Sequence, residues 1–235
     1  MRFELPSAIV GGLKNPGQHI KKNGTVIYMS NVETYNKQLC KEYESSGTIE
    51  LLERYVVSEI LPPIADFPNA IKLIRTNYPC QISSKLLIIG AELLSGWDCG
   101  DNEMLEMLNS MYPYLSTQEK AIVCYLNANH LSFQDKNYER NPAYQKHLLK
   151  SLEYNVSFVK NRIRLADFYA KTAHTQSTAK KLYQEAVKNI VTVFTLEEIQ
   201  QRPVEQFVAP DSYINEFILG TCMAYISFEE LVAKT

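Results

Sequence analysis

Apolar residues recur every three to four positions along most of the chain after residue 30, which is the spacing of one helical face. The stretch between Thr48 and Pro62-Pro63 is typical, with one apolar stripe formed by Leu51, Leu52, Tyr55, Val56 and Ile60. We expect one helix before it, beginning at Asn31, and one after it, with Pro68 in its first turn. The pattern predicts an all-α protein.

The first 30 residues differ, because glycine and proline are too frequent there for a long helix. Within them, the run Thr25–Met29 is rich in β-branched and aromatic residues, so we expect a short strand or an extended lead-in. The apolar run Ala8–Val10 is too short for the core of a secretory signal. We therefore expect an irregular N-terminal segment.

Between residues 83 and 194, a helix–turn–helix pattern occurs in successive copies spaced 35 to 40 residues apart, a period typical of helical-hairpin solenoids. The first helices contain LLIIGAELLSGW, AIVCYLNANHLSF and NRIRLADFYAKT, and each has a small residue at the same position: Gly90, Ala128 and Ala166. The second helices carry Met104, Tyr144 and Ala179 at corresponding positions. A small residue lets paired helices approach closely, so we expect these positions at helix–helix contacts.

The third copy resembles a tetratricopeptide repeat. Its matching residues are Leu165, Ala166 and Tyr169 in the first helix and Ala179, Tyr183 and Ala186 in the second. The copy departs from the motif by one extra residue between its halves and by lacking the terminal proline. The resemblance implies a right-handed stack of antiparallel helices that binds a protein or peptide on its concave surface. A generic antiparallel bundle stays open as the alternative, because such periodicity arises in any helical hairpin.

The C-terminal segment breaks this period. A stack of hairpins needs a cover for its last apolar face. We expect capping helices there, in which four residues close the end of the last hairpin: Tyr213, Phe217, Ile218 and Met223. One continuous domain is thus predicted, with an irregular segment at 1–30, N-terminal helices at 31–78, hairpins at 83–194 and capping helices at 195–235.

Composition and charge narrow the class of protein. No uninterrupted apolar run approaches about 20 residues, so we expect no membrane span. The cysteines lack the spacing of metal or disulfide motifs, which favours reduced thiols and a cytoplasmic location. Charge is segregated: residues 141–190 hold nine basic and three acidic side chains, whereas 81–120 and 191–235 are mainly acidic. Such blocks indicate solvated faces or a charged partner.

Catalytic and cofactor-binding motifs are missing from the sequence. It contains no HExxH, no GxSxG and no phosphate-binding loop ending in GK[ST]. We therefore expect no enzyme activity, no cofactor and no metal. The cluster Asp98, Asp101, Asn102 and Glu103 has the ligand types of a cation site, but a helix cap at Asp101 or Asn102 explains it better.

These observations favour a non-enzymatic module that binds a protein or peptide partner, as a monomer or weak dimer. The alternative is an inhibitor of the bacterial immunity type, which would cover a basic toxin such as a nuclease with acidic surface. Acidic blocks and a pI near 6.1 argue against nucleic-acid binding. Candidate acidic contacts are Asp98, Asp101, Glu103, Glu106, Glu197 and Glu198, and the candidate basic face is Lys146, Lys150, Arg162, Arg164, Lys180 and Lys181.

Overall fold

The computed structural model describes residues 25–61, 64–77, 82–97, 102–190, 204–220 and 228–235. All regular structure in these ranges is helical, which confirms the predicted fold class. The longer helices are α3 (Thr25–Ser46), α4 (Ile49–Ile60), α5 (Phe67–Asn77), α6 (Ser84–Trp97), α7 (Glu103–Ser110), α8 (Thr117–Gln134), α9 (Pro142–Tyr154), α10 (Val159–Ala170) and α11 (Gln176–Asn189). The shorter elements are η2 (Tyr112–Tyr114), η3 (Tyr138–Arg140), η4 (Ala173–Thr175), α13 (Val204–Phe207), α14 (Pro210–Tyr213), the π-helical turn η5 (Ile214–Ile218) and α15 (Phe228–Ala233).

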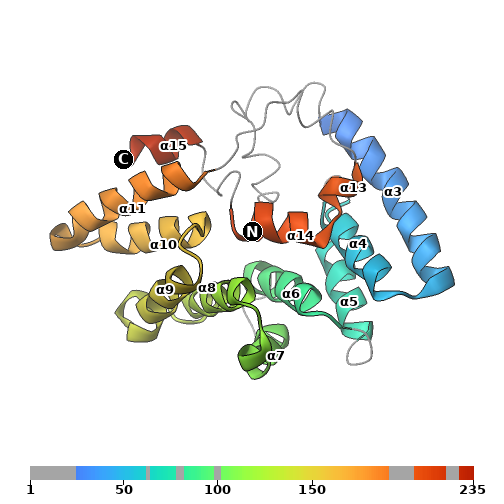
Figure 1. The fold of residues 1–235 in the computed structure, drawn as a ribbon, viewed down its shortest axis with the longest axis horizontal. Coiled ribbons are helices and arrows are strands. Elements are labelled where there is room, and N and C mark those ends of the chain that lie inside the picture. Colours follow the sequence, from blue (N-terminus) through green and yellow to red (C-terminus); the bar gives the residue numbers. More distant parts are fainter. Residues whose placement is uncertain (1–24, 62–63, 78–81, 98–101, 191–203, 221–227) are drawn as a thin grey trace.

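The helices form an open arch, with α3 and α4 at one end and α10 and α11 at the other (Figure 1). Helices α6, α8 and α9 lie between the two ends, and α7 projects from the outer side. Most of the arch shares one apolar core, while α10, α11 and α15 share a smaller cluster around Ala166 and Tyr183. The arch therefore presents an inner and an outer face.

Consecutive helices pack as pairs, as the sequence predicts. Helix α6 packs on α7, α8 on α9 and α10 on α11, and α3 forms a further pair with α4. Local signals set the boundaries: Gly47, at φ +61°, follows α3, and a capping box of Ser116 and Glu119 begins α8. The chain is thus a stack of adjacent helix pairs, an arrangement compatible with a helical-repeat solenoid.

The small residues lie at helix contacts, as expected. Ala128 and Ala166 are fully buried. Gly90 lies against its paired helix, because a Cβ atom added there would lie 2.0 Å from Sδ of Met104. Tyr144 and Ala179, the partners predicted at the position of Met104, are also buried. The predicted spacing of small and large residues therefore corresponds to real packing positions.

Buried polar side chains tie neighbouring helices together. Ser151 on α9 donates to the Ala121 carbonyl on α8 at 2.7 Å, and Asn161 on α10 donates to the Leu148 carbonyl on α9 at 2.8 Å. Asn102 caps α7 and also donates to the Ala91 carbonyl on α6 at 2.9 Å. Each bond supplies a partner to a polar group inside the core and fixes the register of the helices that it joins.

The N-terminal prediction is wrong over Thr25–Met29. These residues form the start of α3, so the first helix begins at Thr25 rather than at Asn31. β-branched residues lower helix propensity by only tenths of a kcal/mol per residue, which the continuing helix overrides. The rest of the predicted irregular segment, residues 1–24, lies outside the described residues.

The C-terminal segment covers a different surface from the one predicted. The segment 204–220 lies on the inner side of the arch, where α13 packs on α3, α14 on α4 and η5 on α6 (Figure 1). Tyr213 and Ile218 are buried there, rather than against the last hairpin. The capping helix is α15, which packs on α11 through the fully buried Leu231. Met223 and the side chain of Phe217 lie outside the described residues.

Candidate functional site

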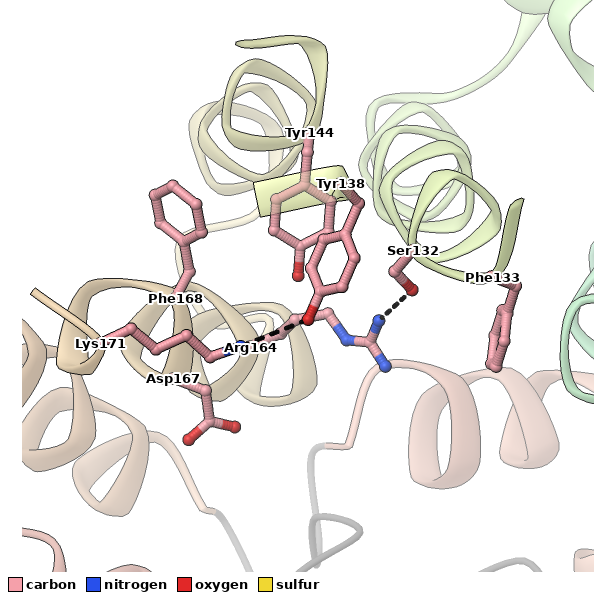
Figure 2. A pocket seen from close by; sticks show the side chains of 8 residues that line it. All are labelled: Ser132, Phe133, Tyr138, Tyr144, Arg164, Asp167, Phe168 and Lys171. Atoms are coloured by element: carbon pink, nitrogen blue, oxygen red, sulfur yellow. Dashed lines mark hydrogen bonds between the residues drawn. The ribbon is translucent and has the colours of Figure 1, made fainter. Parts of the chain in front are cut away.

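A hollow of about 490 Å³ opens between the helix pairs α8–α9 and α10–α11, which correspond to the second and third copies of the sequence pattern and are called the second and third helix pairs below. Figure 2 shows the side chains around it, which come from the end of α8, from η3, from the first turn of α9, and from α10 with its C-cap residue. The lining residues are Ser132, Phe133, Tyr138, Tyr144, Arg164, Asp167, Phe168 and Lys171. Hollows of this volume, with aromatic walls and a few polar groups, are typical of binding sites.

The connection between α8 and α9 places Tyr138 at the rim of the hollow. Helix α8 ends at Gln134, and the carboxylate of its C-cap residue, Asp135, accepts from the backbone N–H of Asn137 at 2.8 Å and so forms a tight turn. The turn leads into η3, and Asn141 then caps α9 ahead of Pro142. These polar residues fix the backbone on either side of an aromatic side chain that faces the opening.

Aromatic rings form a continuous row across the boundary between the two helix pairs. The rings of Tyr138 and Tyr144 meet edge to face with centroids 4.8 Å apart, and Phe168 follows at 5.7 Å from Tyr144. Phe168 in turn lies 5.5 Å from Tyr169, whose hydroxyl accepts from Gln145 on α9. Such contacts are favourable beyond their buried area, so the row makes a firm wall. Phe133 stands on the other side, with 42% of its surface exposed.

Arg164 lies at the floor of the hollow. Its Nη1 donates to the hydroxyl of Ser132 at 3.1 Å, and its guanidinium carbon is 5.8 Å from the centre of the Tyr125 ring. Both contacts come from α8, whereas Arg164 itself is on α10, so they hold the cation in a defined orientation between the two helices. Figure 2 shows the guanidinium below the Tyr138 and Tyr144 rings.

Two ion pairs involve residues that line the same hollow, Lys171 and Asp167. Lys171 pairs with Glu139 and also donates to the Tyr138 hydroxyl at 3.4 Å. The Lys171 ammonium lowers the pKa of the Glu139 carboxyl. Asp167 accepts from the Tyr183 hydroxyl and from Lys234 Nζ, the latter at 3.0 Å. Both carboxylates near the hollow are therefore held by partners on neighbouring elements.

The phenol of Tyr144 stays protonated over the physiological range. Burial raises its pKa to about 12, because the phenolate would lose its hydration, and the charge of Arg164 opposes this shift only in part. Its hydroxyl is therefore a neutral hydrogen-bond donor directed into the hollow (Figure 2).

The six residues of the predicted basic face lie in different environments. Lys146, Lys180 and Lys181 are exposed on α9 and α11, and Lys150 pairs with Glu153 at 2.7 Å. Arg164 lines the hollow. The six residues therefore do not share one environment.

Arg162 is not a surface residue, which corrects its assignment to the basic face. Its exposed fraction is only 8%, and its guanidinium pairs with Glu185 on α11 and donates to the carbonyl of Val156. Arginine can lie this deep because both charge-assisted contacts compensate for the lost hydration. Arg162 thus joins the last helix pair to the turn before it.

The predicted acidic contacts are described only in part. Glu103 forms an ion pair with Arg75, and Glu106 is exposed in the first turn of α7. The other candidates, Asp98, Asp101, Glu197 and Glu198, lie outside the described residues. In the cluster suggested as a cation site, the amide oxygen of Asn102 caps α7 by accepting from the Leu105 N–H at 3.0 Å, so the cap interpretation is confirmed there.

Over the described part of the chain, no group of three or more histidine, cysteine, aspartate or glutamate side chains is arranged to hold a metal ion. None of the helices in those ranges is both long and apolar enough to cross a membrane.

Sequence reasoning selected Arg164 but missed its aromatic neighbours. Tyr138 stands in the polar stretch DKNYERNP, where an isolated aromatic residue between charged residues is the kind of signal that marks a contact surface. Phe133 and Phe168 carry no comparable signal, since each fits the apolar pattern of its own helix. Their association depends on how the second and third helix pairs stack.

No protein-family model matches this chain, and neither the curated proteins nor the solved structures include a significant match to it.

Proposed function

We propose that the chain is a non-enzymatic interaction module that binds a peptide segment of a partner protein in the hollow between the second and third helix pairs. The observation that carries this proposal is the hollow itself, where the aromatic row from Tyr138 to Phe168 faces Phe133 across the Arg164 guanidinium. Tyrosine and arginine are the side chains that contribute most often to binding energy at protein interfaces.

The stacking of helix pairs supports the same proposal. The walls of the hollow belong mostly to the helices α8, α9 and α10, and the wall residue Tyr138 is on the short 3-10 element η3. A segment that binds there meets side chains already held by the Ser132 and Tyr125 contacts of Arg164. Less conformational entropy is then lost on binding. The tetratricopeptide-like pattern of the third pair, which includes Ala166 and Tyr183, is consistent with this role.

A display selection tests the proposal. Short random peptides are selected on the full chain, and the enriched peptides are then measured by fluorescence anisotropy. Replacing Phe133 with Ser should weaken them about tenfold, because a half-exposed aromatic contact is lost.

The matched control is Leu149→Ser. Leu149 has the same exposed fraction as Phe133, 42%, but lies on α9 and does not line the hollow. Its substitution should leave the affinity unchanged. A selection that enriches no peptide, or peptides that bind the Phe133→Ser chain as tightly as the unmodified chain, would overturn the proposal.

A further inference from the structure

Hydrogen-bond donors converge in the hollow. The Arg164 guanidinium lies below the Tyr144 and Tyr138 rings, and both hydroxyl groups lie near it (Figure 2). The raised pKa keeps Tyr144 protonated, as argued above. A cation and a neutral donor therefore face the same space, which favours a ligand group rich in acceptors.

The acceptors next to the hollow are already used within the chain. Asp167 is held by Tyr183 and Lys234, and Glu139 is held by Lys171. The hydroxyl of Ser132 accepts from Arg164 and itself donates to the Asn129 carbonyl at 2.6 Å. A cationic side chain of a partner would have to compete with these contacts.

The local balance of charge points the same way. Around the hollow, Arg164, Lys171 and Lys234 outnumber the carboxylates Asp167 and Glu139. Lys136 and Arg140, which flank Tyr138 in the sequence, are exposed as well. An excess of cations around a hollow with partly apolar walls attracts anionic groups and raises their association rate.

We infer that the bound segment is acidic: it presents an aspartate or glutamate carboxylate to Arg164 and places a neighbouring apolar side chain against Phe133 and Phe168. This inference rests on the proposed function and specifies its ligand. A planar guanidinium suits a carboxylate, with which it forms paired hydrogen bonds. The aromatic walls, of which Phe133 is the most exposed, suit the apolar neighbour.

The first test changes the peptide and keeps the protein chain unmodified, so its result does not depend on whether a protein variant folds. Peptides enriched on the full chain should contain an acidic residue next to an apolar one. Synthetic versions with that residue changed to its amide should bind roughly 10- to 100-fold more weakly, because a charge-assisted contact is lost. A version with phosphoserine in place of the acidic residue shows whether a phosphate satisfies the same donors.

A protein variant supplies the second arm. Selection on the Arg164→Glu chain should enrich basic residues where the unmodified chain enriches acidic ones, and Arg164→Lys should keep part of the affinity for the acidic peptide. Circular dichroism checks that each variant is folded. The matched control is Lys181→Glu, an exposed cation on α11 away from the hollow, which should leave the selected peptides unchanged.

The two proposals fail in different ways. Peptides that depend on Phe133 but contain no acidic residue, or that tolerate the amide change, would overturn the acidic ligand and leave the binding site intact. Peptides that bind independently of Phe133 would overturn the site itself. Acidic peptides that bind the Arg164→Glu chain as tightly as the unmodified chain would also contradict the inference.

Discussion

Gly90 of α6 lies so close to Met104 of α7 that a single added carbon would reach within 2.0 Å of the methionine sulfur. The same carbon would lie 3.1 Å from Cδ1 of Ile74 on α5. The lack of a side chain at Gly90 thus sets how closely three successive helices approach one another. Contact with Gly90 also explains the size of the residue at position 104. Glycine leaves room for a methionine there, whereas the α10–α11 pair has Ala179 at the corresponding position, opposite the larger Ala166.

Replacing Gly90 with Ala should lower the free energy of unfolding by up to about 2 kcal/mol, since overpacking costs about 1–3 kcal/mol and the better helix propensity of Ala returns about 1 kcal/mol. Met104→Ala alone should also destabilise, by about 2–5 kcal/mol, because it leaves a cavity. The double variant should be more stable than the sum of the two changes predicts, because the new methyl group occupies part of that cavity. Urea denaturation of the four chains measures the coupling, and strict additivity would mean that the two positions do not touch.

Leu231 and Val232 offer a matched pair for testing the cap. Leu231 is fully buried in the cluster of α10 and α11, whereas its neighbour Val232 is 44% exposed. Leu231→Ala should destabilise by about 2–5 kcal/mol and increase hydrogen exchange in α11, while Val232→Ala should cost about 0.5 kcal/mol or less. Equal effects of the two substitutions would show that α15 does not cover the last helix pair.

Helix pairing and most helix boundaries, though not the start of α3 at Thr25, could be predicted from the sequence because their causes are local. Thr48 caps α4, Ser116 and Glu119 form the capping box of α8, and Gly47 follows the end of α3 with a positive φ. Each signal acts within a few residues of itself, so it can be recognised without knowing the rest of the fold. The small residue at position 90 also indicates which helices pack together, because Gly90 lies against Met104 of the next helix.

Contacts between distant segments could not be predicted in this way. An apolar stripe around Tyr213 shows that this segment buries one face, but not that the face lies against α4 and α6 rather than α11. Arg162 appears as a surface cation in the sequence because its two partners, Glu185 and the Val156 carbonyl, come from separate turns. The hollow could be predicted only in part for the same reason. Arg164 could be selected from its charge, whereas the aromatic walls come from several elements whose packing the sequence does not reveal.

Glu92 joins the inner segment to both halves of the arch. Its carboxylate accepts from Lys160 on α10 at 3.2 Å and from the Tyr213 hydroxyl on α14 at 3.3 Å. Burial, together with the nearby carboxylate, raises the pKa of Tyr213 well above its usual value. The phenol therefore remains a donor wherever the chain is folded.

Removing that donor by Tyr213→Phe should lower the free energy of unfolding by about 1–2 kcal/mol, because the ring still fills its site but one bond to a carboxylate is lost. Hydrogen exchange should increase in α14 and η5 and at the start of α10 near Lys160, but not in α11. The matched comparison is Tyr114→Phe, which changes an 88% exposed tyrosine. The same exchange pattern in both variants would argue against a link through Glu92.

Glu119 should make stability depend on pH. Burial raises the pKa of its carboxyl, but hydrogen bonds from Ser116 and Ser84 outweigh burial and bring the pKa below its usual value of 4.5. The folded state therefore favours the carboxylate, so this contribution to stability is complete above pH 4.5 and is lost as pH falls through the lowered value.

Glu119→Gln should be less stable than the unmodified chain at neutral pH and should lose less stability on acidification, as measured by urea denaturation at a series of pH values. Ser84→Ala, which removes one donor, should flatten the profile in part. Parallel pH profiles for all three chains would exclude Glu119 as the titrating group.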